Sequence, residues 1–359
     1  MIDYQLMLNI TNEIVAIIFF VMLIVGWYYV AAFIISGKKV KPVPHSDKKT
    51  KFAVIIPARN EARVIKNSLN SMLKQTYDKN FFDVWVIVES EDDPTTIICR
   101  SFDYKYFVRT NLENRRTKGF AIQELIEYFN QNNLEYDAYM IFDADNIATP
   151  RYLETMNDLR QTGVQVGMGY RNYTNASENT LTCISAVFFS YMFTMTARMR
   201  TNLFKKSTVC GTGFFIDSQV IKDAGGWIFT GMTEDTQLTT YCYYHDVSMR
   251  YYPLVEFYDE QGGSWKASHR QMIRWIWGFF EKRGKFKKPT VDYHSTTDKQ
   301  RFWSKFEYNV SIYPFIFFTV SNLLLFIISF TLSLLSLIDK SELTGQFVGQ
   351  AFISIGVLF

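Results

Sequence analysis

The sequence predicts an α/β domain with a mostly parallel sheet, tethered to a membrane at both ends. Two observations indicate this class. Between residues 50 and 275, strand-like apolar runs alternate with segments of helical periodicity, which is the pattern of strands joined by crossover helices. Long uncharged apolar runs flank this region on both sides, and such runs are typical of membrane spans.

The first apolar run predicts a transmembrane helix at residues 14–36. From Ile14 to Ile35 it holds about 22 residues without a charge, whereas roughly 20 residues cross a bilayer core. A signal peptide is disfavoured, because no Lys or Arg precedes the run and no small-residue cleavage site follows it. Lysines follow at positions 38, 39, 41, 48, 49 and 51, so the positive-inside rule makes residues 1–13 extracytoplasmic and everything from residue 37 cytoplasmic.

The polar middle of the chain is predicted to hold the sheet and its crossover helices. The runs between turn signals are apolar and short enough for buried strands, and the segments between them have apolar residues at helical spacing. Such strands place site residues at their carboxyl ends. Predicted strands cover residues 51–57, 82–88, 139–142 and 164–170, and predicted helices cover residues 61–73 and 118–130.

Apolar segments near and after the end of this region predict further contact with the membrane. Residues 276–307 combine Trp and Phe with Lys and Arg, as in an interfacial amphipathic segment. Residues 308–338 predict a second transmembrane helix. Residues 345–359 are apolar but short, which indicates a partial or truncated span. Residues 181–197 fit either an in-plane membrane helix or core.

Charge and cysteine content exclude other classes. The chain has 38 basic and 35 acidic residues and a net charge of +3, so no overall field favours nucleic acid. Its four cysteines lie on the cytoplasmic side without metal-ligand spacing, so we expect reduced thiols and no zinc site. The four histidines show no pairing for a metal or a triad.

An Asp-x-Asp pair follows the strand predicted at residues 139–142. Asp143 and Asp145 are two residues apart and therefore share a face of an extended segment. Their oxygens suit Mg²⁺ or Mn²⁺, and such a cation would neutralise a diphosphate. Asp-x-Asp pairs also occur in solvated loops, but the position directly after a buried strand favours a metal site.

Polar residues at two other strand ends predict a nucleotide site. Pro57 ends the first strand, and the loop with Asn60 and Glu61 can wrap a nucleobase and ribose. After the second strand, the acids between positions 89 and 93 can accept hydrogen bonds from uracil or ribose. The alternative is an acid-rich helix N-terminus, which the macrodipole favours. The acids assigned to the nucleotide are Glu91, Asp92 and Asp93.

Two more segments are predicted to contact a ligand. Lys118 follows two arginines and precedes a glycine, so it can meet phosphates or lie in a solvated basic loop. Cys210, Gly211 and Thr212 are small residues that let a backbone approach a ligand closely. We expect the Cys210 thiol to be packed, because no nucleophilic cysteine is required.

A patch of three residues is predicted on a later helix. Gln271, Arg274 and Trp275 lie at i, i+3 and i+4, so a helix displays them together. The arginine supplies delocalised charge for leaving phosphates, and the tryptophan offers a flat face on which an acceptor sugar can stack. The alternative is an amphipathic helix at the membrane surface.

In this order the motifs resemble the membrane-integrated, processive-type family 2 glycosyltransferases, which include cellulose, chitin and hyaluronan synthases. The resemblance covers roughly residues 50–285. It implies a GT-A fold, a UDP-sugar donor, Mg²⁺ or Mn²⁺, and inversion at the anomeric carbon. The motifs are Pro57-Ala58-Arg59-Asn60-Glu61, Glu91-Asp92-Asp93, Asp143-x-Asp145, Cys210-Gly211-Thr212-Gly213, Thr233-Glu234-Asp235 and Gln271-x-x-Arg274-Trp275.

The resemblance also assigns the catalytic carboxylate to Asp235. An inverting transfer needs a base that takes the proton of the acceptor hydroxyl as its oxygen attacks C1, and Glu234 would then orient or stabilise the site. A structural interpretation is an N-cap at Thr233 with acids in the first helical turn. The two interpretations are compatible.

Three functions fit these residues. The first is a polysaccharide synthase at the cell membrane, which moves a hexose or N-acetylhexosamine from a UDP-sugar to a growing polymer. The second is a lipid glycosyltransferase of the glycosyl-diacylglycerol or ceramide type with the same site. The few predicted spans keep this second function open, unless the chain is truncated or assembles with itself or with a membrane partner to form a polymer channel. The third is a catalytically silent membrane scaffold, which the intact acids argue against.

Overall fold

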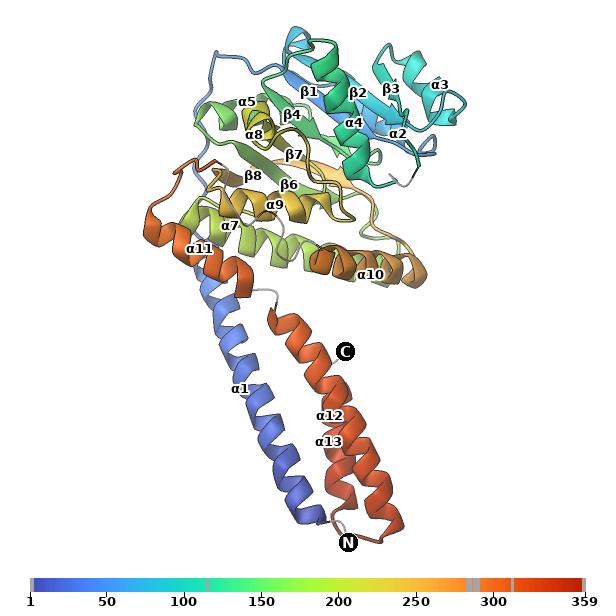
Figure 1. Cartoon of the computed structure of the whole chain (residues 1–359), viewed down its shortest axis with the longest axis vertical. Coiled ribbons are helices and arrows are strands. Elements are labelled where there is room, and N and C mark those ends of the chain that lie inside the picture. Colours follow the sequence, from blue (N-terminus) through green and yellow to red (C-terminus); the bar gives the residue numbers. More distant parts are fainter. Residues whose placement is uncertain (1–2, 114–115, 282–285, 287–290, 311–312, 357–359) are drawn as a thin grey trace. The chain divides into compact units, whose positions relative to one another are not determined.

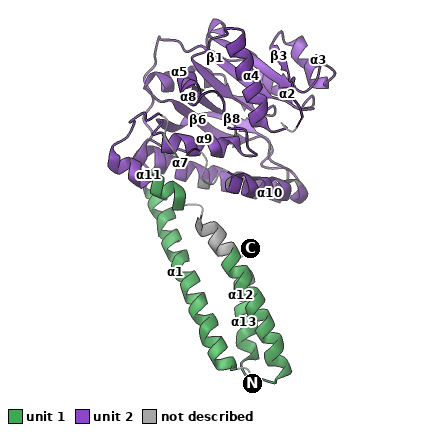
Figure 2. Ribbon diagram, viewed as in Figure 1, with its two compact units in different colours: residues 1–34, 305–359 green, residues 35–304 purple. Residues whose placement is uncertain are grey.

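The computed structural model describes residues 3–113, 116–281, 286, 291–310 and 313–356. Two compact units divide the chain (Figure 2). One unit is helical and combines residues 1–34 with residues 305–359. The other unit holds residues 35–304 and contains the sheet and all predicted site residues.

The larger unit is built on a sheet whose strands are labelled in Figure 1. The strands are β1 (Phe52–Pro57), β2 (Phe82–Val88), β3 (Lys105–Val108), β4 (Ala138–Ile141), β5 (Ile147–Ala148), β6 (Val166–Tyr173), β7 (Phe214–Asp217) and β8 (Met249–Asp259). Their order in the sheet is β3-β2-β1-β4-β7-β6-β8-β5.

The sheet is parallel in its first half and mixed in its second. Strands β3, β2, β1 and β4 run parallel, and Phe52 pairs with both Phe82 and Ala138. Strand β7 is antiparallel to β4 and β6, and β5 is antiparallel to β8. Strand β6 is parallel to β8, so six of the eight described strands run in one direction. The prediction of a mostly parallel sheet is therefore correct, and β7 and β5 are its antiparallel exceptions.

Helices cover the parallel half on both faces. The strand residues of β1 are almost all buried, as expected for strands with a helical layer on each side. On one face Phe52, Val54 and Ile56 pack with Leu69 and other residues of a single hydrophobic cluster. The helices of this half and its connections are α2 (Ile65–Leu73), the short η1 (Lys79–Phe81), α3 (Pro94–Ser101), α4 (Lys118–Gln131), α5 (Tyr152–Gln161), α8 (Ser218–Asp223) and α9 (Glu234–Tyr244).

The region from residue 180 to residue 204 forms α6 (Thr180–Phe188), the π-helical turn η2 (Phe189–Phe193) and α7 (Thr194–Phe204). By length and composition it could cross a membrane. However, α7 is bonded to β8, because Thr194 Oγ1 lies 2.9 Å from Tyr251 Oη and the Tyr251 N–H donates to Thr201 Oγ1 at 3.1 Å. We therefore assign α7 to the domain, whereas α6 exposes apolar side chains.

Helix α10 (Trp265–Glu281) is continuous across residue 276, where the interfacial segment is predicted to begin. The apolar periodicity on both sides of residue 276 belongs to one continuous helix. The next helix, α11 (Asp298–Val310), begins within the larger unit.

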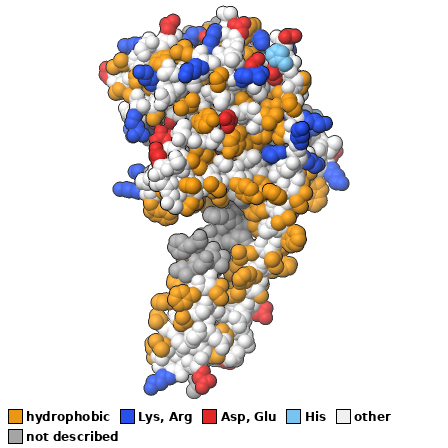
Figure 3. Space-filling view, turned by 180° about the vertical axis from the view of Figure 1, so that it is seen from behind, with side chains coloured by type: hydrophobic (Ala, Val, Ile, Leu, Met, Phe, Trp, Pro, Cys, Tyr) orange, Lys and Arg blue, Asp and Glu red, His pale blue; other side chains and the backbone are white. Residues whose placement is uncertain are grey.

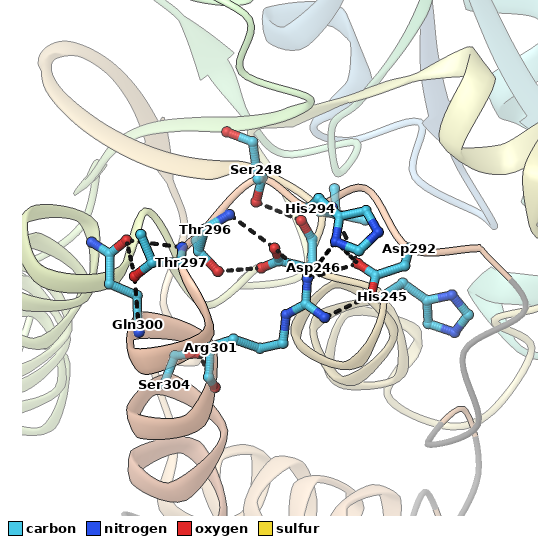
Figure 4. A network of polar contacts seen from close by, with 12 residues as sticks. His245, Asp246, Ser248, Asp292, His294, Thr296, Thr297, Gln300, Arg301 and Ser304 are labelled. Atoms are coloured by element: carbon cyan, nitrogen blue, oxygen red, sulfur yellow. Dashed lines mark hydrogen bonds and ion pairs between the residues drawn. The ribbon is translucent and has the colours of Figure 1, made fainter.

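A polar network fixes the segment before α11 to the domain (Figure 4). The Asp246 carboxylate accepts hydrogen bonds from the Thr296 N–H at 2.9 Å and from Arg301 at 3.1 Å. It also forms an ion pair with Lys206 at 2.8 Å, and both side chains of this pair are fully buried. Arg301 donates in turn to Asp292 at 2.6 Å.

The helical unit contains α1 (Tyr4–Ser36), α12 (Tyr313–Ile338) and α13 (Thr344–Gly356). Helix α1 begins at Tyr4, so most of the predicted extracytoplasmic segment 1–13 is helical. By length and composition, α1 and residues 320–338 could each cross a membrane. Hydrophobic side chains occupy much of the visible surface of these helices (Figure 3).

Candidate active site

The predicted Asp-x-Asp pair forms a tight turn directly after β4. The Asp143 N–H donates to Thr212 Oγ1 at 2.8 Å and to Asn146 Oδ1 at 3.1 Å. Thr212 is 3% exposed and its hydroxyl also contacts the Asn146 side chain. The Thr212 side chain therefore supports the turn, and its predicted contribution to substrate binding stays a prediction.

A second layer of polar residues holds the other side of this turn. The Asn146 Nδ2 group donates to Asp145 Oδ1 at 3.0 Å and to Asp259 Oδ1 at 2.6 Å. Asp259, at the end of β8, pairs with Arg171 of β6. We did not predict Asn146, Arg171 or Asp259. Strand pairing between β6 and β8 places Arg171 and Asp259 close together, and their sequence separation gives no signal. Asn146 directly follows Asp145 in the sequence, and this position could have selected it.

Lys118 is the residue that links the predicted motifs. Its Nζ atom, at the start of α4, donates to Asp143 Oδ1 at 2.5 Å and to the Gly211 carbonyl at 2.6 Å. The same atom lies 3.6 Å from Glu234 Oε1. The structure thus brings Lys118, Asp143, Gly211 and Glu234 together, although they are separated by up to 116 positions in the sequence.

The catalytic candidate Asp235 lies in the first turn of α9. Its Oδ1 atom accepts the Thr236 N–H at 2.7 Å. Gly211 has a positive φ of 73°, and a Cβ atom added to it would lie 3.5 Å from Asp235 Oδ2. The backbone of the Cys210–Thr212 segment therefore passes beside the second carboxylate oxygen, and the glycine makes this left-handed conformation accessible.

Burial and like charge shift the acids of this site in the same direction. Burial, with the charges of Asp259 and Asp143, raises the pKa of Asp145 to about 8. Burial raises the pKa of Glu234 to about 7, although Lys118 opposes the shift. The pKa of Asp235 is also raised by burial. Acids whose pKa is raised towards neutral pH at a strand edge are typical of functional sites.

The same acids fit a divalent cation. Across the described residues, no three His, Cys, Asp or Glu side chains are grouped to enclose an ion. A cation such as Mg²⁺, however, is usually held by one or two carboxylates while substrate phosphates supply other ligands. Asp143 and Asp145 provide such a pair, and the crowding that raises the pKa of Asp145 would be relieved by a cation.

The loop after β1 is fixed by Asp93. Asn60 has a φ of 57°, and its N–H donates to Asp93 Oδ2 at 3.1 Å. The Thr95 N–H donates to Asp93 Oδ1 at 2.8 Å, so Asp93 is the N-cap of α3. Both carboxylate oxygens bind backbone N–H groups and the residue is 5% exposed, so Asp93 supports the loop, and its predicted contact with the nucleotide stays a prediction.

The remaining acids after β2 differ in their surroundings. Glu91 pairs with Arg100 at 2.6 Å, and Asp92 is exposed. Glu89, directly after β2, pairs with Arg59 of the loop after β1 at 2.9 Å. Glu89 therefore faces the predicted nucleotide loop, and its position as the first residue after the strand was the signal that could have selected it. Pro57 ends β1 as predicted.

The three residues of the predicted patch on α10 differ in their exposure. Trp275 is 37% exposed and packs edge to face on Phe189, with ring centroids 5.6 Å apart. Gln271 is half-buried, whereas Arg274 is exposed. Burial raises the pKa of Cys210 to about 12, so its thiol is protonated, in agreement with a packing role.

An open sheet with an Asp-x-Asp turn, a lysine and helix-borne acids at one edge defines a nucleotide-dependent transferase domain. Residues 49–278 match the family described as glycosyltransferase like family 2. The chain belongs to this family, and the predicted family is confirmed. Its subgroup of processive synthases is not shown by this match.

Relatives agree with the class. The chain is 30% identical over 240 residues to the probable glycosyltransferase YdaM of Bacillus subtilis (strain 168), covering 64% of this chain and 55% of that protein. It is 25% identical over 243 residues to glucomannan 4-beta-mannosyltransferase 1 of Cyamopsis tetragonoloba, covering 65% and 46%. The chain thus spans about half the length of these curated relatives.

A solved structure shares the fold. It is the mannosyltransferase PcManGT of Pyrobaculum calidifontis in complex with GDP-Man and Mn²⁺, with a TM-score of 0.63 and 14% sequence identity over 98% of this chain and 97% of that chain. At this identity the likeness shows the fold alone. The predicted GT-A fold is confirmed at this coarser level, as a GT-A-like glycosyltransferase fold.

Proposed function

We propose that the chain is a membrane-bound, inverting hexosyltransferase that transfers a hexose or N-acetylhexosamine from a UDP-sugar to a growing polysaccharide. The observation that carries this proposal is the position of Lys118, whose Nζ atom contacts Asp143 and lies 3.6 Å from Glu234. One lysine thus joins the turn suited to a diphosphate and the helix that carries the base.

The residues divide the reaction between them. Asp235 accepts the proton of the acceptor hydroxyl while the hydroxyl oxygen bonds to C1 and the bond from C1 to the diphosphate oxygen breaks. Lys118 places positive charge beside the leaving diphosphate, and Glu234 keeps this lysine in place. Asp143 and Asp145 would hold Mg²⁺ or Mn²⁺, which supplies further neutralisation of phosphate charge when bound.

The nucleoside is proposed to lie at the ends of β1 and β2. Glu61 is half-buried, and burial with the charge of Asp143 raises its pKa, so it faces the same strand edge as the metal pair. Asn60, Glu61 and Glu89 offer acceptors and donors for a base and ribose. Because the solved structure of similar fold contains GDP-Man, the donor test includes GDP-sugars as well as UDP-sugars.

Two acceptors are considered. A polysaccharide is supported by similarity to a glucomannan mannosyltransferase. A lipid acceptor is the second candidate, and exposed apolar side chains beside Trp275 support it. Phe188 of α6 is 56% exposed, and Ile276 and Trp277 of α10 are 50% and 65% exposed. Such a surface suits acyl chains or the membrane interface, which also agrees with a multi-pass protein whose catalytic domain is cytoplasmic.

The test is release of nucleotide by the detergent-purified protein with Mg²⁺ or Mn²⁺, a panel of UDP- and GDP-sugars, and vesicles of host membranes as the acceptor source. Sizing and organic extraction of the product separate the acceptors. A glycosidase-sensitive polymer supports the synthase, and one sugar on an extracted lipid supports the second candidate. No release with any donor from folded protein contradicts the proposed function and favours a silent scaffold.

A further inference from the structure

Helix α10 meets the start of α9 at a glycine. Gly278 is buried, and a Cβ atom added to it would lie 2.2 Å from Thr233 Oγ1 and 2.4 Å from Thr233 Cγ2. Cβ atoms essentially never lie closer than 3.0 Å to another heavy atom, so even alanine would displace the helix or the Thr233 side chain beside it. Thr233 directly precedes Glu234 and Asp235, which makes this contact adjacent to the proposed base.

Thr233 is turned towards α10 rather than used as a helix cap. It occupies the N-cap position of α9, where a threonine hydroxyl ordinarily accepts a backbone N–H of its own helix, yet its side chain makes no such bond. Its Oγ1 atom is buried and has no hydrogen-bond partner among the described residues. Leaving a buried hydroxyl unpaired is unfavourable, so the close approach of α10 outweighs a good cap.

A second contact lies one turn further along α10. The Met232 N–H donates to Glu281 Oε2 at 3.0 Å. A Cβ atom added to Gly231 would lie 2.7 Å from this oxygen, so a glycine on the loop also permits the approach. Gly278 and Glu281 are three residues apart and share a face of the helix.

The same face of α10 carries the acceptor candidate. Trp275 precedes Gly278 by three residues, and its ring packs edge to face on Phe189 at 5.6 Å. Phe189 begins the π-helical turn η2, a rare form that is frequent at functional sites. The helix is therefore held at Phe189 through Trp275 and at Thr233 through Gly278.

We propose that Gly278 is a positioning residue for the acceptor, because its missing side chain seats α10 on Thr233 and thereby fixes Trp275 relative to Asp235. The inference rests on the proposed function, in which Asp235 is the base and Trp275 contacts the acceptor. Glu281 has the same role through Met232. The donor side, built on Asp143, Asp145 and Lys118, lies outside these contacts.

The test compares Gly278→Ala with Gly263→Ala. Gly278 lies within α10, and the control residue Gly263 lies just before this helix. A Cβ atom added to Gly263 would be 3.8 Å from the nearest atom, which is an ordinary van der Waals contact. We expect Gly278→Ala to lower sugar transfer to host membrane vesicles by at least about tenfold, since an error of 1 Å in position can cost about 100-fold. UDP affinity with Mn²⁺ and the thermal midpoint should stay near those of Gly263→Ala.

Rescue separates positioning from a general defect. Thr233→Ser removes Cγ2 and frees the remaining hydroxyl to rotate, whereas threonine is stiff at χ1, so Thr233→Ser should restore part of the transfer lost in Gly278→Ala. Equal transfer by both glycine variants, or no rescue, would overturn the proposal. If Gly278→Ala does not fold, Glu281→Ala takes its place and must lower sugar transfer while UDP affinity is retained. If Glu281→Ala does not show this difference between transfer and affinity, the proposal is overturned. No release by the wild-type protein with any donor instead contradicts the proposed function.

Discussion

At the scale of single residues, the candidate site depends on side chains that hold the predicted acids in place. Asp143 and Asp145 were predicted from their place after a buried strand, and the structure puts them in the turn that follows β4. Of the residues that shape this turn, Asn146 belongs to the turn itself, whereas Thr212 contacts it from a distant part of the sequence. A pattern in the sequence can indicate an acid at a strand end, but not which buried side chains orient it.

Asp235→Asn tests the base. The amide keeps the size of the carboxylate but cannot accept the acceptor proton, so transfer should fall by about 10²–10⁴-fold. Nucleotide affinity with Mn²⁺ should remain nearly unchanged, because Asp235 does not contact the Asp143 turn. Nucleotide release and calorimetric titration of UDP and GDP measure the two effects. Parallel loss of affinity and transfer would assign Asp235 a structural role.

Asp145→Ala tests the metal assignment. Removing a ligand should weaken the Mn²⁺-dependent part of nucleotide affinity by at least about tenfold, the lower end of what loss of an outer-shell group costs. Binding measured without Mn²⁺ should change little. Glu127→Ala, an exposed acid on α4, is the matched control. The metal assignment fails if nucleotide affinity responds to Mn²⁺ equally in both variants.

At the scale of elements, the sequence predicted the strands that follow simple periodicity. The runs at 51–57 and 82–88 match β1 and β2 closely, because strands covered on both faces are continuously apolar. Strands β7 and β8 were not predicted. Strand β7 has four residues, too few for a clear period, and its antiparallel insertion between β4 and β6 depends on pairing across distant segments.

The network around Asp246 predicts a pH dependence of stability. Burial would raise the pKa of Asp246, but bonds from Lys206 and Thr296 hold it at about 2. Because the folded pKa lies below the ordinary value of 3.8, the carboxylate contributes stability that is fully present above pH 4 and is lost as pH falls towards 2. The contribution is about 2 kcal/mol.

Thermal midpoints at pH 7, 4 and 3 measure this effect. Asp246→Asn leaves the Lys206 charge buried without its partner, so it should lower stability at pH 7 by about 3–5 kcal/mol and flatten the loss in acid. Asp47→Asn is the control, because the Asp47 side chain is fully exposed. Burial lowers the pKa of Lys206. Because a lysine titrates at alkaline pH, this shift does not affect the thermal midpoints measured between pH 7 and pH 3. An equal acid response in all three proteins would contradict this role of Asp246.

At the scale of the whole molecule, the candidate active site and two of the candidate membrane spans lie in different units. The larger unit contains every predicted site residue, and the helical unit contains two of the candidate spans. Apolar length predicted these spans, but it could not exclude residues 180–204. This region is less apolar, with a mean hydropathy of 1.4 against 2.5 and 2.1, yet by length and composition it could also cross a membrane, while α7 is bonded to β8. Hydropathy measures composition, and only tertiary contacts separate a span from a cover of the sheet.

The basic residues that flank a membrane span set its orientation, so removing them should change that orientation. Lysines at positions 38, 39, 41, 48, 49 and 51 follow α1, and no Lys or Arg lies in residues 1–13, so the catalytic unit should face the cytoplasm. Trypsin should digest it in inside-out vesicles and spare it in right-side-out vesicles. Changing all six lysines to Gln should give mixed orientation, whereas Lys66→Gln with Lys74→Gln should not, because charges more than about 20 residues from a span have little effect. Protection of the wild-type domain in inside-out vesicles would place the site on the other side of the membrane, away from cytoplasmic nucleotide sugars.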